Sequence, residues 1–321
     1  MIPLPISGLL PIHNGSQWIN KSLPTILNSL GTLDELLVID DGSTDKTFET
    51  ISEFAKKDAR IVIHRFAHSG LVSSLNMGLK LAKNNWIARF DIDDLYPSDR
   101  LVNQRSLILK NENVGAIFSD YNIWKQGEYF RGRIPSPIFA LQTKLSLVNS
   151  QRTAHPSALL NRELVNEVGG YLQEEFPTED LGLWSRLTKV SQLITSEHVG
   201  LEYNRRFGSI SNSMRDVIIA KKSHFFQGIN FSNSETELLI QNVNELLSAY
   251  DSYPLEDVRK FLFSHDYLTF LSVTRDSSLL KARRGLAQKL KKSELTAVLS
   301  PATIKFGAQS LQRKFERVLE R

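Results

Sequence analysis

The sequence predicts an α/β fold in which helices cover both faces of a mostly parallel sheet. Apolar runs of strand length recur through the first 120 residues, and amphipathic segments of helix length stand between them. Strands that alternate with helices form βαβ units, whose strands lie parallel. From about residue 135 the alternation ends and helical patterns come to dominate. We therefore expect a helical C-terminal extension after the α/β part.

Each element follows in order along the chain. Strands are expected at residues 5–10, 35–40, 60–66, 86–92, 114–120 and 191–206. Helices are expected at residues 16–30, 44–58, 70–84, 98–111, 136–150, 161–171 and 179–189. Ser43 or Thr44, Ser98 and Asn161 are the expected N-caps, because their side chains accept hydrogen bonds from the first helical amides. The polar clusters "HN", "DDGSTD" and "DIDD" each follow a strand, so we expect them to meet at the carboxyl edge of the sheet, where ligands bind.

Composition narrows the class of protein. The chain has 321 residues, of which 41% are hydrophobic and 23% charged, as in ordinary globular proteins. It has no cysteine, which excludes disulfides and thiolate zinc sites. The start lacks the basic region of a signal peptide, and no apolar run reaches the roughly 18–20 residues of a membrane-spanning helix. We therefore expect a cytoplasmic protein.

The charge is unevenly distributed. The net charge is +4, but residues 281–321 carry eleven Lys and Arg against three Glu, so this tail has +8 and the rest of the chain −4. Its leucines alternate with basic residues as in an amphipathic helix that lies on anionic lipid, which would place the protein at the inner face of the cell membrane. The alternative is a helix packed on the catalytic domain or on a second subunit of a homo-oligomer. Nucleic-acid binding is not expected, because the basic run lacks interleaved aromatics and the body is acidic.

The stretch "RFDIDDLYPSDR" at residues 89–100 raises the sharpest chemical question, because carboxylates this close repel one another. On an extended backbone Asp91 and Asp93 share a face, while Asp94 points away unless the strand has already turned. Two such carboxylates suit Mg²⁺ or Mn²⁺. The alternative is a solvated loop of turn-forming residues. We favour a metal site, because the preceding strand is buried in character and no basic partner stands alongside the cluster.

Three further clusters each have a structural alternative. Asp40 and Asp41 end a buried strand and could accept hydrogen bonds from a base or a ribose, but "DDGST" is also good turn chemistry. Glu179 and Asp180 start a helix, where the helix dipole alone would favour acids. The basic pair after residue 204 could grip a pyrophosphate or form plain surface charge. The histidines at positions 13, 68 and 155 lie near these clusters, and a structural role is the default for each.

Two common phosphate-binding motifs are absent. No GxGxxG follows a strand, and no GxxxxGK[ST] occurs, so neither a dinucleotide-binding domain nor a P-loop nucleotidase is expected. A phosphate-bearing substrate would therefore be held by metal and arginine.

Taken together, these motifs resemble the family 2 glycosyltransferases, inverting enzymes with the GT-A nucleotide-sugar fold. The matching stretches are "LLPIHN", "ELLVIDDGSTDKT", "HSGLVSSLNMGLKLAKNNWIARFDIDDLYPSDRLVNQ", "HPSALLNRELVNEVGGY", "EDLGLWSRL" and "YNRRFGSIS". The resemblance covers about residues 4–212. It implies a GT-A catalytic domain at residues 1–212 and leaves residues 213–321 as a helical C-terminal region.

The resemblance also implies roles for individual residues. Asp180 would be the catalytic base, Asp93 would bind the metal, and Asp91 would lie towards the ribose and share the metal. Asp41 would contact the base, with Asp40 beside it. The remaining residues expected to bind the donor or the acceptor are Pro11, His13, Asn14, Glu179, Arg205 and Arg206.

The implied reaction is transfer of a sugar from a nucleotide diphosphate to a hydroxyl group, with Mn²⁺ or Mg²⁺ as cofactor. UDP is the default nucleotide by resemblance, and the acceptor would be a glycan or a lipid-linked glycan of a bacterial-type capsule, exopolysaccharide or lipopolysaccharide. Gly15 replaces the acid that often follows Asn14 in the family. The Gln-x-x-Arg-Trp motif and the membrane helices of processive synthases are missing, which favours transfer of a single sugar.

Two other classes compete with this interpretation. One is a sugar-nucleotide-binding or scaffold protein that keeps the fold with weak or no turnover. The other is a nucleotidyltransferase that makes the activated sugar, whose Gly-rich, basic N-terminal loop the sequence lacks.

Overall fold

The computed structural model describes residues 4–125, 128–134, 153–206, 208–214, 216–218 and 221. The chain separates into two compact units, Met1–Asn230 and Phe231–Arg321, and every described residue belongs to the first. The helix expected at residues 136–150 and the basic tail at 281–321 lie outside the described residues. The domain boundary at residue 212 stays a prediction.

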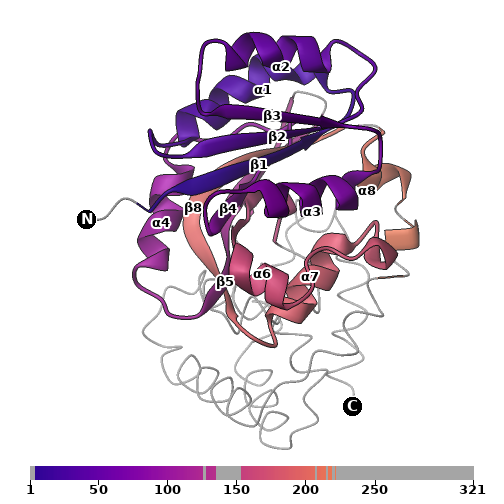
Figure 1. Ribbon diagram of the computed structural model, residues 1–321. Coiled ribbons are helices and arrows are strands. Elements are labelled where there is room, and N and C mark those ends of the chain that lie inside the picture. The colour runs from indigo at the N-terminus through magenta and orange to yellow at the C-terminus, as the bar shows by residue number, and fades with distance from the viewer. Residues whose placement is uncertain are drawn as a thin grey trace, which may run out of the picture. The chain divides into compact units, whose positions relative to one another are not determined.

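The described elements follow the predicted order (Figure 1). The strands are β1 (Ile6–Ile12), β2 (Glu35–Asp41), β3 (Ile61–Phe66), β4 (Trp86–Arg89), β5 (Val114–Lys125), β6 (Glu128–Ile134), β7 (Leu159–Asn161) and β8 (Gln192–Arg205). The helices are α1 (Ser16–Ser29), α2 (Thr47–Ala55), α3 (Leu71–Leu81), α4 (Arg100–Ile108), α6 (Arg162–Glu167), α7 (Glu179–Leu187) and α8 (Ile210–Ser213). Two 3-10 turns, η1 (His155–Ser157) and η2 (Gln173–Glu175), precede β7 and α7.

One sheet organises these elements, in the order β3-β2-β1-β4-β7-β5-β6, with β8 paired to β5. Strands β1 to β4 run parallel to one another, and β8 runs parallel to β5. The short strand β7 runs antiparallel between β4 and β5, so the direction of β5 agrees with that of β4. The predicted α/β class is therefore confirmed, and the loops after β1, β2, β4, β5 and β8 leave the sheet at one edge.

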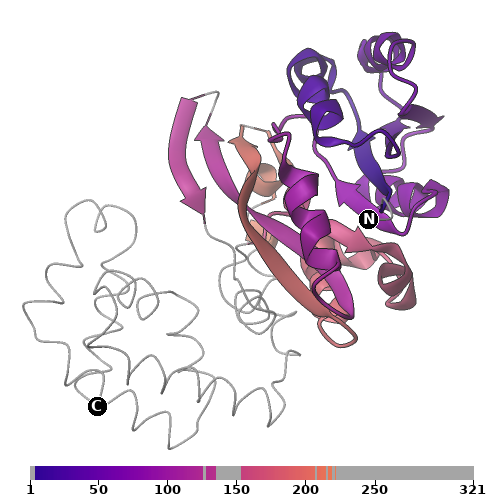
Figure 2. The same ribbon diagram turned by 90° about the vertical axis from the view of Figure 1, so that its left-hand side faces the viewer.

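Both faces of the sheet are covered, as predicted. Alternate side chains of one strand belong to different cores: Leu36 and Val38 of β2 pack with α1, α2 and α4, whereas Leu37 and Ile39 pack with α3, α6 and α7. Figure 1 shows α3 on the opposite side of β1 to β3 from α1 and α2. A view turned by 90° shows the long strands β5 and β8 side by side and the β5–β6 hairpin extending from them (Figure 2). The strands are thus held rigidly at the edge where their polar ends meet.

Some local predictions differ from the structure. Asn161 caps α6 as predicted, because its side chain accepts from the amides of Glu163 and Leu164. Ser43, Thr44 and Ser98 are not the N-caps, because α2 begins at Thr47, after Lys46, and α4 begins at Arg100, after Asp99. Ser43 and Thr44 instead form hydrogen bonds with Asn14, which join the loops after β1 and β2.

Candidate active site

The acidic turn, defined here as residues 91–94, lies immediately after β4. β4 ends at Arg89, so the expected extension of this strand to residue 92 is wrong, and the backbone at the acids is a turn. The hydroxyl of Tyr96 holds this turn, accepting from the Asp91 amide at 2.6 Å and donating to the Asp91 carbonyl at 3.2 Å. As a result, one carboxylate oxygen from each of Asp91, Asp93 and Asp94 lies within 4.8 Å of the others. Asp94 thus joins the two predicted metal ligands instead of pointing away.

Two arginines compensate the acidic turn. Arg89 is buried and donates to Asp91 Oδ1 at 2.8 Å. Arg206, just after β8, places Nε 2.5 Å from Asp93 Oδ2. The premise that no basic partner stands beside the acids is therefore wrong: arginines from two elements do so, one adjacent in sequence and one folded in from afar.

The charges of Arg89 and Arg206 do not fully offset the cost of burying three carboxylates close together. Burial and the Asp91 charge raise the pKa of Asp93, although Arg206 acts to lower it. Burial and both neighbouring acids raise the pKa of Asp94 well above its ordinary value. Asp94 is 1% exposed, its Oδ1 accepts from the Asn204 amide at 2.7 Å, and its Oδ2 is buried without a hydrogen bond among the described residues.

This donor set fits a hard divalent cation. Mg²⁺ and Mn²⁺ prefer carboxylate oxygens, and three are within reach of one point in space. A bound cation would offset both the burial and the mutual repulsion that raise the pKa values of Asp93 and Asp94, and it could contact the Asp94 Oδ2 that lacks a hydrogen bond within the described part of the chain. The residues that could hold such an ion are Asp91 and Asp93, as predicted, with Asp94 added by the structure.

The predicted catalytic pair stands at the first turn of α7. Glu179 is buried, with Oε2 lacking a hydrogen bond among the described residues, and Asp180 is half-buried, with Oδ1 accepting from the Leu181 amide at 2.8 Å. Burial first, and then the Asp180 charge, raise the pKa of Glu179 to about 7. At neutral pH Glu179 is therefore partly protonated.

The start of α7 and the acidic turn belong to one electrostatic neighbourhood. The charges of Arg89, Asp91 and Asp180 all contribute to the pKa shifts of Tyr171 and Glu179, in addition to the burial of both side chains. The half-buried His155 forms a hydrogen bond of 2.8 Å with the Tyr171 hydroxyl, and burial of its ring together with Arg89 lowers its pKa well below the usual value. A neutral His155 thus supports Tyr171, in keeping with the structural role expected for this histidine.

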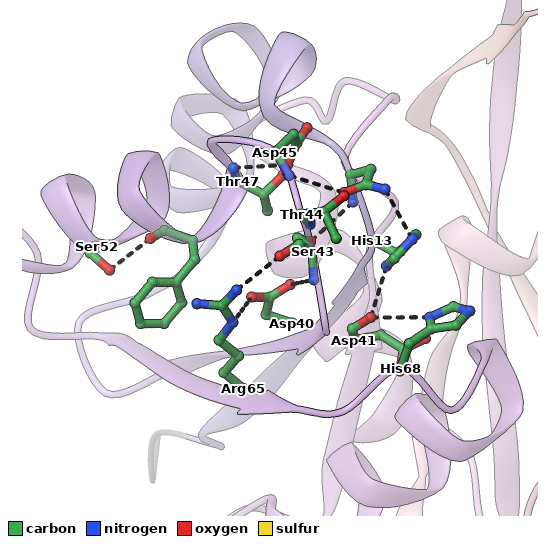
Figure 3. A network of polar contacts seen from close by, with 12 residues as sticks. His13, Asp40, Asp41, Ser43, Thr44, Asp45, Thr47, Ser52, Arg65 and His68 are labelled. Atoms are coloured by element: carbon green, nitrogen blue, oxygen red, sulfur yellow. Dashed lines mark hydrogen bonds and ion pairs between the residues drawn. The ribbon is translucent and has the colours of Figure 1, made fainter.

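The loops after β1 and β2 form a third part of the site (Figure 3). His13 Nδ1 donates to the Asp41 carbonyl at 2.8 Å, and His68 Nδ1 lies 2.9 Å from Asp41 Oδ2. The two imidazole centroids are 4.3 Å apart, and both rings are exposed. Figure 3 shows His13 and His68 converging on Asp41, where they form an exposed aromatic surface at the edge of the sheet.

The carboxylates of the predicted Asp40–Asp41 pair already have partners within the protein. Asp40 is fully buried, accepts from the Ser43 amide at 3.0 Å, and lies 3.2 Å from Arg65 Nε. The oxygens of Asp41 accept from the amides of Ser69 at 2.7 Å and Gly70 at 2.9 Å, just before α3. Asp40 thus holds the loop after β2, and Asp41 joins it to α3.

The remaining predicted residues occupy different positions. Asn14, with a positive φ of 53°, uses its side chain to hold Thr44, and its amide donates to Ser43 Oγ at 3.0 Å. Pro11 is buried inside β1, opposite Ile39 of β2. Arg205 is exposed at the end of β8, so the ion pair with the acidic turn falls to Arg206. The structure therefore gathers Asp91, Asp93 and Arg206 directly, and Asn14 serves the loops around them.

Three residues of the site escaped prediction. Arg89 had a visible signal, because an arginine inside the apolar run "WIARF" needs a partner when that strand is buried. His68 was noted only as a histidine near the site. Trp18 of α1 lies under the Arg206 guanidinium, whose Cζ is 4.4 Å from the ring centroid, and nothing in the sequence relates these two distant positions.

Comparison with known proteins gives a consistent result. The family model described as "Glycosyl transferase family 2" matches residues 7–169, more than half of the chain. A curated relative, the UDP-Glc:alpha-D-GlcNAc-diphosphoundecaprenol beta-1,3-glucosyltransferase WfgD of Escherichia coli, is 27% identical over 213 residues, which are 65% of this chain and 80% of that protein. Four other curated relatives are matched over only 18% to 48% of their own length.

Two solved structures have a similar fold. The S. aureus TarS 1-349 crystal structure in complex with UDP-GlcNAc has a TM-score of 0.54 and 17% identity, covering 86% of this chain and 79% of that one. The mannosyltransferase PcManGT from Pyrobaculum calidifontis, in complex with GDP-Man and Mn²⁺, has a TM-score of 0.51 and 16% identity, covering 88% and 87%. At these identities the likeness concerns the fold.

Proposed function

The chain belongs to glycosyl transferase family 2 and has the GT-A fold, and from this premise we propose that it is an inverting, metal-dependent enzyme that transfers one sugar from a nucleotide diphosphate to a hydroxyl group. The observation that carries the proposal is that the acidic turn lies close enough to the first turn of α7 to act on its side chains: burial first, and then the charges of Asp180 and Asp91, raise the pKa of Glu179. The carboxylates that could hold the cation of a metal–diphosphate complex thus lie near Asp180, the candidate base.

Asp180 is the base in this proposal. Its carboxylate takes the proton of the acceptor hydroxyl while the oxygen attacks the anomeric carbon from the face opposite the diphosphate. The bond from that carbon to the diphosphate oxygen breaks, and the nucleoside diphosphate leaves with the electron pair. A single displacement inverts the anomeric configuration.

The other residues bind and orient. Asp91 and Asp93, with Asp94, would hold Mn²⁺ or Mg²⁺, which when bound acts as a Lewis acid on the leaving diphosphate. Arg206 would donate to the diphosphate, as arginine does in bidentate fashion. Asn14, Asp40 and Asp41 would shape the nucleotide pocket, in which the exposed ring of His13 is available for stacking with the base.

We assign a UDP-sugar as donor and a glycan or lipid-linked glycan as acceptor, in surface polysaccharide synthesis. The names of two relatives support this choice, since one uses UDP-Glc on a diphosphoundecaprenol-linked sugar and the other is bound to UDP-GlcNAc. The neighbour with GDP-Man keeps GDP in the set of donors to test. The competing function is a sugar-nucleotide-binding scaffold with little or no turnover, which the same fold would allow.

Substitution of Asp180 by Asn separates enzyme from scaffold. We expect Asp180→Asn to keep the affinity for UDP and Mn²⁺ within about threefold, because the amide keeps the shape of the side chain, while sugar transfer or slow donor hydrolysis falls by about a hundredfold or more. Binding is measured by calorimetry, and turnover by release of UDP from a panel of UDP- and GDP-sugars with Mn²⁺.

The matched control is Asp99→Asn, which removes the same charge from an exposed carboxylate at the start of α4. It should leave both binding and turnover unchanged. Activity that survived in Asp180→Asn would exclude Asp180 as the base. A wild-type chain that bound UDP-sugars without any turnover would instead support the scaffold, and one that bound no nucleotide would contradict the proposed function altogether.

A further inference from the structure

Two arginines face the acidic turn, and their surroundings differ. Arg89 is 2% exposed and is held by Asp91 Oδ1 and the Phe90 carbonyl. The side chain of Arg206 is 32% exposed, while that of its partner Asp93 is 18% exposed. The side chain of Arg89 is enclosed and cannot reorient, whereas the side chain of Arg206 is partly exposed to solvent where it contacts Asp93. Only Arg206 can therefore exchange one anionic partner for another.

The backbone that carries Arg206 is tied to the acidic turn. The amide of Asn204 donates to Asp94 Oδ1 at 2.7 Å, and Leu95 pairs with Glu202 of β8 through hydrogen bonds of 3.2 and 2.9 Å. The end of β8 thus stays beside the carboxylates whichever partner the side chain of Arg206 selects. The long side chain can reorient about this fixed base.

Trp18 provides the surface along which Arg206 lies. Its ring centroid is 4.4 Å from the Arg206 Cζ, a distance typical of a cation–π contact. Trp18 is itself partly buried against the core formed with α1. The guanidinium therefore lies on an aromatic ring that packs against the core, with its Nε directed to Asp93 Oδ2.

Resting on the proposed function above, we propose that Arg206 competes with the divalent cation for Asp93 and passes to the donor diphosphate when the cation binds, with Trp18 as the positioning residue that keeps it within reach. Arginine stays protonated, so it leaves Asp93 when a cation binds the carboxylate and another anion binds the guanidinium. The diphosphate that accompanies the metal then offers oxygens that suit the planar fork better than a single carboxylate oxygen does. The charge on Asp93 is compensated throughout, by guanidinium first and by metal afterwards.

This exchange predicts effects of opposite sign for two ligands. In Arg206→Gln no guanidinium competes with the cation for Asp93, so the affinity for Mn²⁺ alone should rise by about threefold to tenfold. The affinity for UDP in the presence of saturating Mn²⁺ should fall by about tenfold or more, because a charged hydrogen-bond donor to the diphosphate is lost. Free Mn²⁺ is measured by its electron paramagnetic resonance signal, and UDP binding by calorimetry, both on the full chain.

Variants of Trp18 test the positioning role. Trp18→Leu removes the aromatic face but keeps an apolar side chain, and should shift both affinities in the same directions as Arg206→Gln by about twofold to fivefold. Trp18→Phe keeps the face and should restore values close to wild type. Phe48→Leu is the matched control. The Cζ of Arg65 lies 4.7 Å from the centroid of the Phe48 ring in the same kind of cation–π contact, but Arg65 pairs with Asp40 and not with the acidic turn. It should leave the affinity for Mn²⁺ alone unchanged.

Several outcomes would overturn the exchange. A lower or unchanged Mn²⁺ affinity in Arg206→Gln would show that the arginine does not compete with the cation, and an unchanged UDP affinity would show that it does not pass to the diphosphate. If Arg206→Gln fails to fold, Arg206→Lys, which keeps the charge and loses the planar fork, should still lower the affinity for UDP. Failure of the proposed function is distinct: wild type would bind no nucleotide, whereas the Mn²⁺ measurement would still report on the competition.

Discussion

Close placement of three acids is tolerated here because individual side chains compensate them. Arg89 and Arg206 each take one oxygen of the acidic turn, and the Tyr96 hydroxyl fixes its backbone. The sequence predicts a divalent cation between Asp91 and Asp93, and the structure brings one carboxylate oxygen of each within 4.8 Å of the other, so the metal site stays a prediction. It did not show that arginines supply part of that charge, because one of them lies 113 residues away from its partner.

Glu179 makes a prediction at the scale of one residue. Its pKa of about 7 in the folded chain lies above the ordinary value of 4.5, so the neutral form favours folding, and its contribution is full below pH 4.5 and lost as the pH rises through 7. Glu179→Gln stays neutral, so its free energy of unfolding should gain on wild type by about 3 kcal/mol at most between pH 4.5 and pH 8. Urea unfolding at a series of pH values measures this difference.

A second variant separates the causes of that shift. Burial is the larger cause and the neighbouring charge of Asp180 the next, so Asp180→Asn should move the midpoint of the effect to lower pH without abolishing it. A difference between Glu179→Gln and wild type that stayed constant from pH 4.5 to pH 8 would mean that Glu179 titrates normally in the folded chain.

At the scale of elements, one carboxylate joins the starts of two helices. Asp45 accepts from the Ser16 amide at the start of α1, at 3.1 Å, and from the Thr47 amide at the start of α2, at 3.0 Å. Burial acts to raise the pKa of Asp45, but hydrogen bonds from Thr47 and Ser16 together lower it to about 2. The loops after β1 and β2 are thereby fixed to one another beside the site.

Substitution of Asp45 should weaken this junction. We expect Asp45→Ala to lower the free energy of unfolding by about 1–2 kcal/mol at pH 7, because two helix amides lose a charged acceptor. The pKa of Asp45 in the folded chain lies below its ordinary value of 3.8, so this stabilisation is present above pH 3.8 and is lost as the pH falls through about 2. Asp45→Asn, which keeps one acceptor oxygen, should lose less at pH 7. An equal loss at pH 7 and at pH 2.5 would contradict the charge-based part of this effect.

Secondary-structure prediction succeeded for long periodic elements and failed for short ones. The strands that became β1 to β5 and β8 and the helices α1 to α4, α6 and α7 were predicted near their observed positions, because hydrophobic periodicity is strong over such lengths. β6 and β7 were missed, and β7 has only three residues, too few for a pattern. The sequence predicts a strand as far as residue 92, because Ile92 continues the apolar alternation of β4, whereas the strand ends at Arg89 and the chain turns.

At the scale of the whole molecule, the described part of the chain contains no helix of the length and apolarity that a membrane crossing requires. The basic tail of residues 281–321 lies outside the described residues, so its interpretation still rests on composition. With a charge of +8 against a body of −4, it is the segment that we expect to contact an anionic membrane.

Vesicle binding tests this expectation on the full chain. We expect co-sedimentation with vesicles rich in phosphatidylglycerol at low salt, and release at about 0.5 M salt, where charges are screened within a few ångströms. Vesicles of phosphatidylcholine should not bind. Replacement of Lys289, Lys291 and Lys292 by Gln should weaken binding by about 1 kcal/mol per charge. Retention that did not depend on salt or lipid charge would favour a tail packed on protein.

The sequence by itself determined the fold class, the family and the acids of the acidic turn, because these depend on periodicity and on motifs read within short stretches. The tertiary structure alone decided which side chains contact one another. Arg206 contacts Asp93 and Trp18, and Asp41 contacts His68 and the amides before α3. Hydrophobic periodicity and short motifs predict which secondary structure a segment will form. The partners of a buried charge depend on which loops the sheet brings to one edge, and that is known only once the chain has folded.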